Sequence, residues 1–208
     1  RFHRAIWLDC DAVVLNDLSD VFAVLERFDI VGAHEQFGSA PVSMQVLDYE
    51  IPHAFRQINS GVLGVRRTPE VLNFLRLWRE EFEDRNLQYD QPLLRRLLWE
   101  SDLRVFILPM EYNQMFPPFI RVSTNRMMAP RVLHVTQLHE VESHAELPDQ
   151  PFNPAELVTP QVRDRINDLM ISDRTLGAGR DTRALMGDML RQAPWLYRLV
   201  RRLRRFMN

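Results

Sequence analysis

Residues 5–14 read Ala5-Ile6-Trp7-Leu8-Asp9-Cys10-Asp11-Ala12-Val13-Val14, close to the start of a chain of 208 residues. The first four are mostly apolar and predict a strand covered on both faces, which needs no polar alternation. Two carboxylates follow it, in the place where open α/β sheets bind ligands. Asp9 and Asp11 either begin a solvated turn or share one divalent cation, because hard cations prefer oxygen ligands.

The composition is that of a globular protein with a sizeable core, since 46% of the residues are hydrophobic and 26% are charged,. No apolar run reaches the ~18 residues that a membrane-spanning helix needs. The chain begins at Arg1 without a signal peptide and enters a strand at once, which indicates an incomplete chain,. The single cysteine, Cys10, excludes an internal disulfide and favours a reducing compartment,.

The charges are distributed unevenly along the chain. All 26 basic residues are arginine, and there is no lysine. Residues 1–150 contain 15 arginines and 22 acidic residues, whereas residues 151–208 contain 11 arginines and 6 acidic residues. This asymmetry predicts different partners for the two parts.

The chain alternates between apolar strand patterns and helical patterns, which predicts an α/β fold. Strands are expected at 29–33, 58–65, 105–108 and 131–135, and helices at 19–28, 68–84, 92–100, 161–171 and 182–192 and from 194 on,. Residues 36–56 form a long loop, and loops of that length are more often functional than idle. Prolines and acids mark 140–160 as a linker between a domain at 1–139 and a helical tail at 161–208,.

Three further polar groups lie at or beside the ends of these elements. They are Asn59-Ser60-Gly61 in a strand, Asp90-Gln91 at a helix start and His134 in the last strand. Each has a structural explanation: a β-bulge for the first, a helix cap for the second and a core histidine for the third. Together with the two early carboxylates, they form a much more specific set.

The order of these groups resembles GT-A fold glycosyltransferases, and most closely the family 8, galactosyltransferase and glycogenin-like group. Residues 7–18 are similar to the Asp-x-Asp region of that group, Ile58–Val62 to its Asn-Ser-Gly strand, and Tyr89–Gln91 to its Asp-Gln segment. Val132–His134 resembles the segment with its metal-binding histidine, so the resemblance spans about residues 5–136. It implies an α/β partial GT-A fold with a mixed sheet, apparently lacking the N-terminal nucleotide-binding part and followed by a helical tail.

The resemblance implies a hexosyltransferase that uses a nucleotide-diphosphate sugar, for example a UDP-sugar, and a glycan or lipid-linked acceptor. By analogy, Asp9, Asp11 and His134 hold Mn²⁺ or Mg²⁺ between the two phosphates. Mn²⁺ accepts carboxylate and imidazole together, and such an ion stabilises the charge on the leaving diphosphate.

The same resemblance implies roles for the remaining motif residues. Asn59, Ser60 and Gly61 are expected to contact the donor sugar. Asp90 and Gln91 are the expected catalytic residues, with Gln91 near the anomeric carbon of a reaction that retains configuration. Because an amide is a poor nucleophile, we expect electrostatic support of an oxocarbenium-like state rather than a covalent adduct.

The sequence departs from the family pattern after His134. The family has a glycine and a Lys-Pro-Trp segment there, whereas this chain continues Thr136-Gln137-Leu138-His139 and has no lysine. Arg131 and Arg126 are the candidates to replace the phosphate-binding lysine.

Two rival functions are compatible with parts of the sequence. In a haloacid-dehalogenase-type phosphatase, Asp9 would be the nucleophile and Asp11 the general acid. That fold also needs a basic residue, usually lysine, and a second acidic pair, and the strands at 105–108 and 132–135 do not end in acids. A catalytically inactive GT-A-like binding module is the other alternative.

The C-terminal segment 194–207 has seven apolar residues on one side of a helix and five arginines on the other,. Such a helix either lies on an anionic membrane surface or docks its apolar side on the domain. Nucleic acid is not an expected partner, because the main domain is acidic and no readout motif accompanies the helix. The expected location is cytoplasmic, including the inner face of the membrane.

Overall fold

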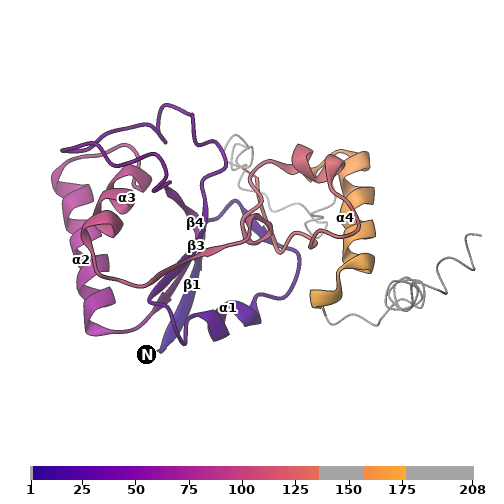
Figure 1. Cartoon of the computed structure of the whole chain (residues 1–208), viewed down its shortest axis with the longest axis horizontal. Coiled ribbons are helices and arrows are strands. Elements are labelled where there is room, and N and C mark those ends of the chain that lie inside the picture. The colour runs from indigo at the N-terminus through magenta and orange to yellow at the C-terminus, as the bar shows by residue number, and fades with distance from the viewer. Residues whose placement is uncertain (1, 136–156, 177–208) are drawn as a thin grey trace, which may run out of the picture.

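A computed structural model of the chain describes residues 2–135 and 157–176 (Figure 1). Its main sheet has the strand order β1 (Arg4–Leu8), β4 (Ile58–Arg66), β3 (Ile30–His34) and β5 (Val105–Leu108). A separate two-stranded ribbon pairs β2 (Ala12–Val14) with β6 (Val132–His134). The expected α/β class with a mixed sheet is confirmed.

The direction of the strands brings several chain segments to one edge of the main sheet. β4 is antiparallel to both β1 and β3, and β3 is parallel to β5. The carboxyl ends of β1, β3 and β5 therefore meet at the edge where β4 begins. This is the edge at which open α/β sheets bind ligands.

Helices cover the two faces of the main sheet (Figure 1). On one face, α2 (Pro69–Asp84) and α3 (Gln91–Glu100) pack on Ile30 and Leu63. On the other face, α1 (Ser19–Val24) packs on Val31 of β3 through a smaller core. The result is a three-layer arrangement around β3 and β4.

The start of α2 shows why the sequence predicted this helix correctly. The Thr68 side chain accepts a hydrogen bond from the main-chain N–H of Val71 at 3.2 Å, and Pro69 occupies the first helical position. Both features stabilise a helix start, since proline there loses no helical hydrogen bond. The apolar stripe of the helix then faces the sheet.

The burial of β1 differs from the expectation. The strand alternates between half-buried and exposed residues, and Trp7 is 64% exposed. β1 is the last strand of the main sheet in the described residues, and α2 and α3 pack on β3, β4 and β5 instead. The prediction of a strand covered on both faces is therefore wrong for the described part of the chain.

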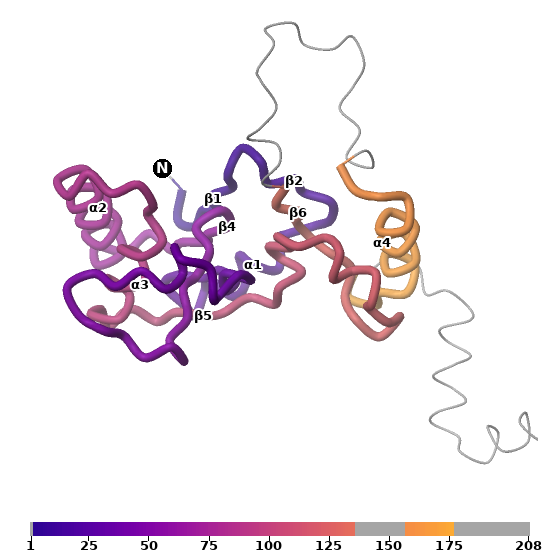
Figure 2. Tube along the Cα trace, turned by 90° about the horizontal axis from the view of Figure 1, so that it is seen from above, coloured from indigo at the N-terminus to yellow at the C-terminus, as the bar shows by residue number. Residues whose placement is uncertain are grey.

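A second core lies beside the ribbon of β2 and β6 (Figure 2). Helix α4 (Pro160–Ser172) packs with η2 (Pro117–Val122) and with Leu133 of β6. A buried ion pair joins Arg131 Nη1 to Asp173 Oδ2 at 3.1 Å. The division into a domain, a linker and a tail stays a prediction, and the helices expected beyond residue 176 lie outside the described residues.

Two short 3-10 helices complete the described elements, η1 (Met110–Tyr112) after β5 and η5 (Arg174–Leu176) after α4. Among the residues that the structure describes, no helix combines the length and the apolar character needed to cross a bilayer.

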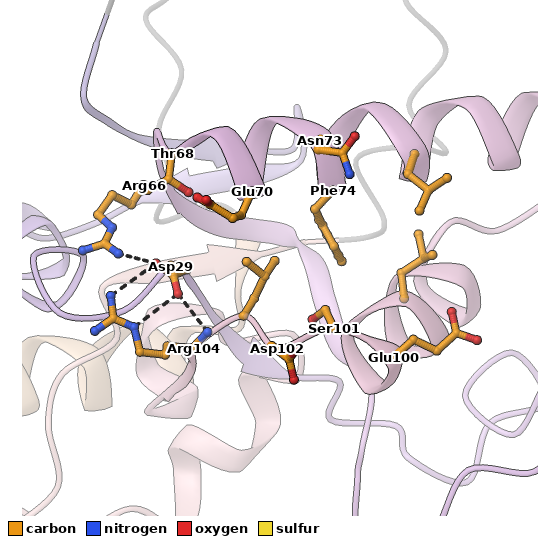
Figure 3. Close-up of a pocket in the computed structure, with 13 residues that line it drawn as sticks. Asp29, Arg66, Thr68, Glu70, Asn73, Phe74, Glu100, Ser101, Asp102 and Arg104 are labelled. Atoms are coloured by element: carbon orange, nitrogen blue, oxygen red, sulfur yellow. Dashed lines mark hydrogen bonds and ion pairs between the residues drawn. The ribbon is translucent and has the colours of Figure 1, made fainter.

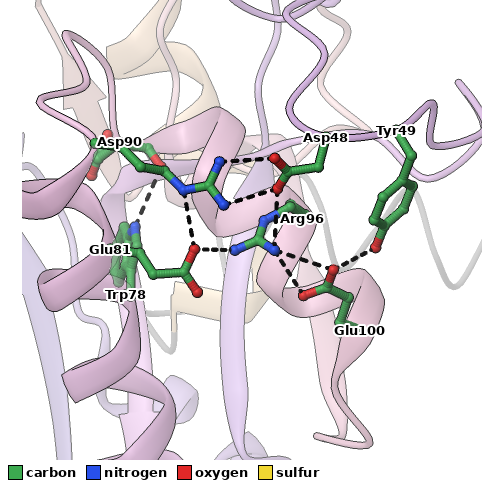
Figure 4. A network of polar contacts seen from close by, with 8 residues as sticks. Asp48, Tyr49, Trp78, Glu81, Asp90, Arg96 and Glu100 are labelled. Carbon is green, nitrogen blue, oxygen red and sulfur yellow. Dashed lines mark hydrogen bonds and ion pairs between the residues drawn. The ribbon is translucent and has the colours of Figure 1, made fainter.

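Loop 36–56 is fastened to α2 and α3 by a network of charges (Figure 4). Both oxygens of Asp48 accept hydrogen bonds from Arg85, at 2.9 and 3.0 Å. Arg96 lies 3.4 Å from Asp48 and also pairs with Glu81 and Glu100. Bidentate arginine–carboxylate pairs fix orientation as well as distance. The loop therefore has a defined position against α2 and α3.

Candidate metal and sugar site

Asp9, Asp11 and His134 converge at the carboxyl end of β1. One ligand atom from each residue can be chosen so that all three atoms lie within 4.8 Å of one another. The main chain sets this arrangement: the N–H of Asp9 donates to Gly61 O, and the N–H of Val135 donates to Asp11 O, each at 2.9 Å. Pairing of β2 with β6 thus brings together residues that are 123 positions apart in the sequence.

Two contacts orient the side chains of this group. The indole N–H of Trp7 donates to Asp9 Oδ1 at 2.8 Å. His134 Nε2 lies 3.1 Å from Asp11 Oδ1, and both side chains are buried. Two carboxylates and an imidazole nitrogen therefore face one small region.

A chain of hydrogen bonds behind His134 determines which of its nitrogens faces the site. The N–H of Gly61, which can only donate, bonds to Asn59 Oδ1 at 3.0 Å. Asn59 Oδ1 also accepts from Asn113 Nδ2 at 2.8 Å, so Asn113 Oδ1 must face His134 Nδ1, at 3.0 Å. Nδ1 therefore carries a proton, and Nε2 is the ring nitrogen that faces Asp11,.

The other end of this series of hydrogen bonds is Glu35, which follows β3. Asn59 Nδ2 donates to Glu35 Oε2 at 2.9 Å, and the N–H of Phe37 donates to Glu35 Oε1 at 2.9 Å. Asn59 is only 1% exposed, so in this conformation it orients its neighbours. Its predicted contact with a sugar stays a prediction.

Gly61 makes room for the ring of His134. A Cβ atom at this position would lie 2.2 Å from His134 Cε1 and 2.7 Å from Nδ1. Separations this short do not occur between real atoms, so any side chain at position 61 has to displace the imidazole,. The role of Gly61 in the structure is thus to let the backbone approach His134.

Asp90 does not act as the helix cap that the sequence allowed. Its side chain makes no capping hydrogen bond, and its Oδ1 accepts from Ser60 Oγ at 3.2 Å. Trp78 Nε1 holds the main-chain oxygen of Asp90 at 3.3 Å (Figure 4). Burial, together with the charge of Asp9, raises the pKa of the Asp90 carboxyl, against the hydrogen bond from Ser60,. Asp90 therefore faces the same site.

Gln91 is the first residue of α3, next to Asp90. Its Oε1 atom is buried and makes no hydrogen bond within the described part of the chain. A buried amide oxygen without a partner is costly, and a bound ligand that offers positive charge or a donor would relieve that cost. The structure thus brings Asp90 to the same end of the sheet as the metal-site residues, and Gln91 follows it in the chain.

The set of donors fits a divalent metal ion. Two carboxylates and a neutral imidazole suit Mn²⁺, and the fixed Nδ1–H of His134 is the usual orientation of a metal-binding histidine,. Mg²⁺ is less well matched by the imidazole, since it prefers oxygen ligands.

Sequence reasoning missed Asn113 and Glu35, which support this arrangement from behind. Both are buried, and both follow carboxyl ends of strands, β5 and β3. Their position after the strands expected at 105–108 and 29–33 was the signal that could have found them. Arg131, one candidate for the missing lysine, is engaged by Asp173 and is 2% exposed, so it does not take that role here.

A cavity of about 540 Å³ lies away from this site. Its wall includes Asp29, which is bonded to Arg66 and Arg104 (Figure 3). In the sheet, Arg66 lies opposite Arg4, toward the other end of β4 from Gly61. This cavity is therefore at the other end of the sheet from the candidate metal site. A second cavity of about 470 Å³ lies at the site end, lined by Glu35 and Gln57 among others.

Residues 4–144 match the family model described as nucleotide-diphospho-sugar transferase. The chain therefore belongs to this family, and the expected resemblance is confirmed. Comparison with curated proteins gave no match.

Solved glycosyltransferases are similar in structure at low sequence identity. The galactosyltransferase LgtC, bound to donor and acceptor sugar analogues, is 18% identical, with a TM-score of 0.44 over 81% of this chain and 62% of that chain. Mouse xyloside xylosyltransferase 1 is 16% identical, with a TM-score of 0.39 over 65% and 58% of the two chains. GlyE from Streptococcus pneumoniae TIGR4 is 16% identical, with a TM-score of 0.44 over 82% and 42%. The chain thus spans less than two thirds of each of these proteins.

Proposed function

We propose that the chain forms the metal-binding and sugar-binding part of a glycosyltransferase that moves a hexose from a nucleotide-diphosphate sugar. The observation that carries this proposal is the meeting of Asp9, Asp11 and His134 at the carboxyl edge of the sheet, near Asp90. Membership of the nucleotide-diphospho-sugar transferase family supports it.

A bound Mn²⁺ would supply positive charge to the leaving diphosphate of the donor. Asp9, Asp11 and His134 are the residues that would hold it. The protein's own contribution is a preset geometry: Trp7 orients one carboxylate, and the chain from Gly61 fixes the imidazole. Preset ligands lose little conformational freedom on binding.

The chemistry of the sugar falls to Asp90 and Gln91. The Asp90 carboxylate, and the Gln91 Oε1 atom that makes no hydrogen bond among the described residues, are the groups proposed to stabilise positive charge at the anomeric carbon,. Because the Gln91 amide is a poor nucleophile, we propose that the acceptor attacks from the side of the leaving group and that configuration is retained. Trapping of a glycosyl adduct on either residue would contradict this mechanism.

The acceptor is proposed to be a glycan or a lipid-linked sugar. Phe37, Phe116 and Phe119 are partly exposed and contact one another edge to face, with ring centres 5.8 and 5.1 Å apart. Aromatic faces of this kind can pack against sugar rings. Anchoring to a membrane by 194–207 and a cytoplasmic location stay predictions, because that segment lies outside the described residues.

The direct experiment is release of UDP from UDP-hexoses by the 208-residue chain, with and without Mn²⁺. Asp11→Asn and His134→Ala should each abolish metal-dependent release, while Asp84→Asn, an exposed carboxylate on α2, should leave it unchanged. Metal binding without turnover of any donor would favour the inactive binding module. Metal-independent release that survives both site variants would refute the proposed site.

A further inference from the structure

The second cavity lies between loop 36–56 and the start of β4, and its wall includes Glu35, Ser43 and Gln57. Its volume of about 470 Å³ lies within the range of small-molecule sites,. Glu35 joins it to the candidate metal site, because the same carboxylate accepts the hydrogen bond from Asn59. Only the Glu35 side chain therefore separates a molecule in this cavity from the hydrogen bonds that orient His134.

The charged groups of the wall are mainly cationic. Arg56 and Arg95 line the cavity, against one carboxylate, that of Glu35. Both oxygens of Glu35 already accept hydrogen bonds, from Asn59 and from the main chain. In the described part of the chain, neither arginine pairs with a carboxylate. Two arginines face one carboxylate in this wall, so its charged groups leave a net positive charge.

Each guanidinium is held in place by main-chain oxygens. Arg95 donates to the carbonyls of Phe55, Ile51 and Pro52 through Nε and Nη2. Arg56 Nη2 donates to Glu35 O at 2.7 Å. Burial lowers the pKa of Arg95, but arginine stays protonated in proteins,. Carbonyl contacts fix both groups without neutralising them.

Gly38 keeps the Arg56 guanidinium close to the backbone. A Cβ atom at position 38 would lie 2.6 Å from Arg56 Nη2 and 3.2 Å from its Cζ. The guanidinium thus lies close to the loop backbone, and its Nε and Nη1 form no hydrogen bond with the described residues. Such open donors can form charge-assisted hydrogen bonds with a carboxylate or a phosphate.

Two neutral polar groups in the wall also lack partners. Ser43 is 7% exposed and Gln57 is 3% exposed, and neither Ser43 Oγ nor Gln57 Oε1 makes a hydrogen bond among the described residues. Buried polar atoms rarely stay unsatisfied. A ligand with hydroxyl groups would supply both partners.

We propose that this cavity binds the acceptor sugar through an anionic group, either the carboxylate of an acidic sugar or the phosphate of a sugar phosphate. Arg56 and Arg95 recognise the anionic group, and Ser43 and Gln57 bond to sugar hydroxyls. This assignment rests on the proposed transferase function and names the chemical class of its acceptor.

The test measures equilibrium binding to the 208-residue chain by titration calorimetry, without metal or donor, at low salt. The probes are galactose 6-phosphate, glucuronate and neutral galactose. At least one anionic sugar should bind about tenfold more tightly than galactose, because hydrogen bonds to charged groups are the stronger ones. Arg56→Gln should remove that advantage. The matched variant Arg79→Gln, at an exposed position of α2, should keep it.

The two anionic probes distinguish a phosphate acceptor from a carboxylate acceptor. Equal affinity for the anionic and neutral sugars, or a full anionic preference in Arg56→Gln, would overturn the proposal. UDP that competes with the anionic sugar would also overturn the proposal if Arg56→Gln weakened UDP binding as much as sugar binding. The cavity would then hold the donor instead of the acceptor. UDP release in the absence of an acceptor tests the transferase function separately, so the two failures can be told apart.

Discussion

The substitution Gly61→Ala tests how the backbone of β4 positions the metal ligand. The added Cβ would lie 2.2 Å from His134 Cε1, whereas an ordinary contact is at least 3.4 Å, so the ring has to move by roughly 1 Å,. The ring is buried and bonded to Asn113, so it cannot swing into solvent. Displacing it moves Nε2 away from Asp11.

Loss of such positioning typically weakens metal binding by about 10- to 100-fold, and overpacking costs about 1–3 kcal/mol of stability. Gly64→Ala is the matched control on the same strand, because its Cβ would lie 2.5 Å from Val31 Cγ2 in the core beneath α1. Titration with Mn²⁺, followed by electron paramagnetic resonance, and thermal unfolding measure the two effects.

Both alanine variants should unfold at a lower temperature than the original chain, and only Gly61→Ala should lose Mn²⁺ affinity. If Gly61→Ala bound Mn²⁺ normally, or if Gly64→Ala lost affinity equally, the positioning of His134 by the backbone would be refuted.

Three further changes give distinct outcomes. Asn113→Ala removes the acceptor that fixes the Nδ1 proton of His134, and it should lower Mn²⁺ affinity by about 10- to 100-fold in the same titration,. Asp29→Asn removes the buried carboxylate that the half-buried Arg66 and the exposed Arg104 share, and it should cost about 1–2 kcal/mol in chemical unfolding at pH 7,. Asp48→Asn releases one anchor of loop 36–56, and faster limited proteolysis within that loop should report it,.

The Asp29 variant also has a defined pH dependence. Burial alone would raise the pKa of this carboxyl, but hydrogen bonds and charges from Arg104 and Arg66 lower it overall,. A lowered folded pKa gives stability that is complete above the unfolded pKa, about 3.9, and is lost as pH falls through the folded pKa. The stability difference between the original chain and Asp29→Asn should therefore shrink below about pH 4. A difference that stayed constant down to pH 2 would contradict this linkage.

The other two variants have their own controls. Asn125→Ala, an exposed asparagine outside the site, should bind Mn²⁺ normally. Asp102→Asn, exposed beyond α3, should leave the cleavage rate in loop 36–56 unchanged. Equal proteolysis of the Asp48→Asn and original chains would show that the network in Figure 4 does not hold the loop.

Local sequence patterns predicted the elements whose causes are local. The cap at Thr68, the proline after it and the apolar stripe that follows are sufficient to define α2,. The pairing of β2 with β6 joins residues more than a hundred positions apart, and no local pattern carries that information,. The burial of β1 was misjudged for a related reason, since apolar periodicity does not say which strand is at the edge of a sheet.

The sequence predicted the residues that form the candidate metal site but not the residues that hold them in position. Asp9, Asp11 and His134 were grouped by their resemblance to a family, and the structure brings them together. Only their position after expected strands marks Glu35 and Asn113 in the sequence, because their role depends on hydrogen bonds to Asn59 that form in the fold. Whether a buried amide supports a site is decided by tertiary packing.

The central claim is that Asp9, Asp11 and His134 form one metal site, and Mn²⁺ titration of the 208-residue chain tests it most directly. The original chain should bind one Mn²⁺, and Asp11→Asn and His134→Ala should each abolish that binding while the fold is retained in circular dichroism. Unchanged Mn²⁺ binding in both variants would contradict the claim.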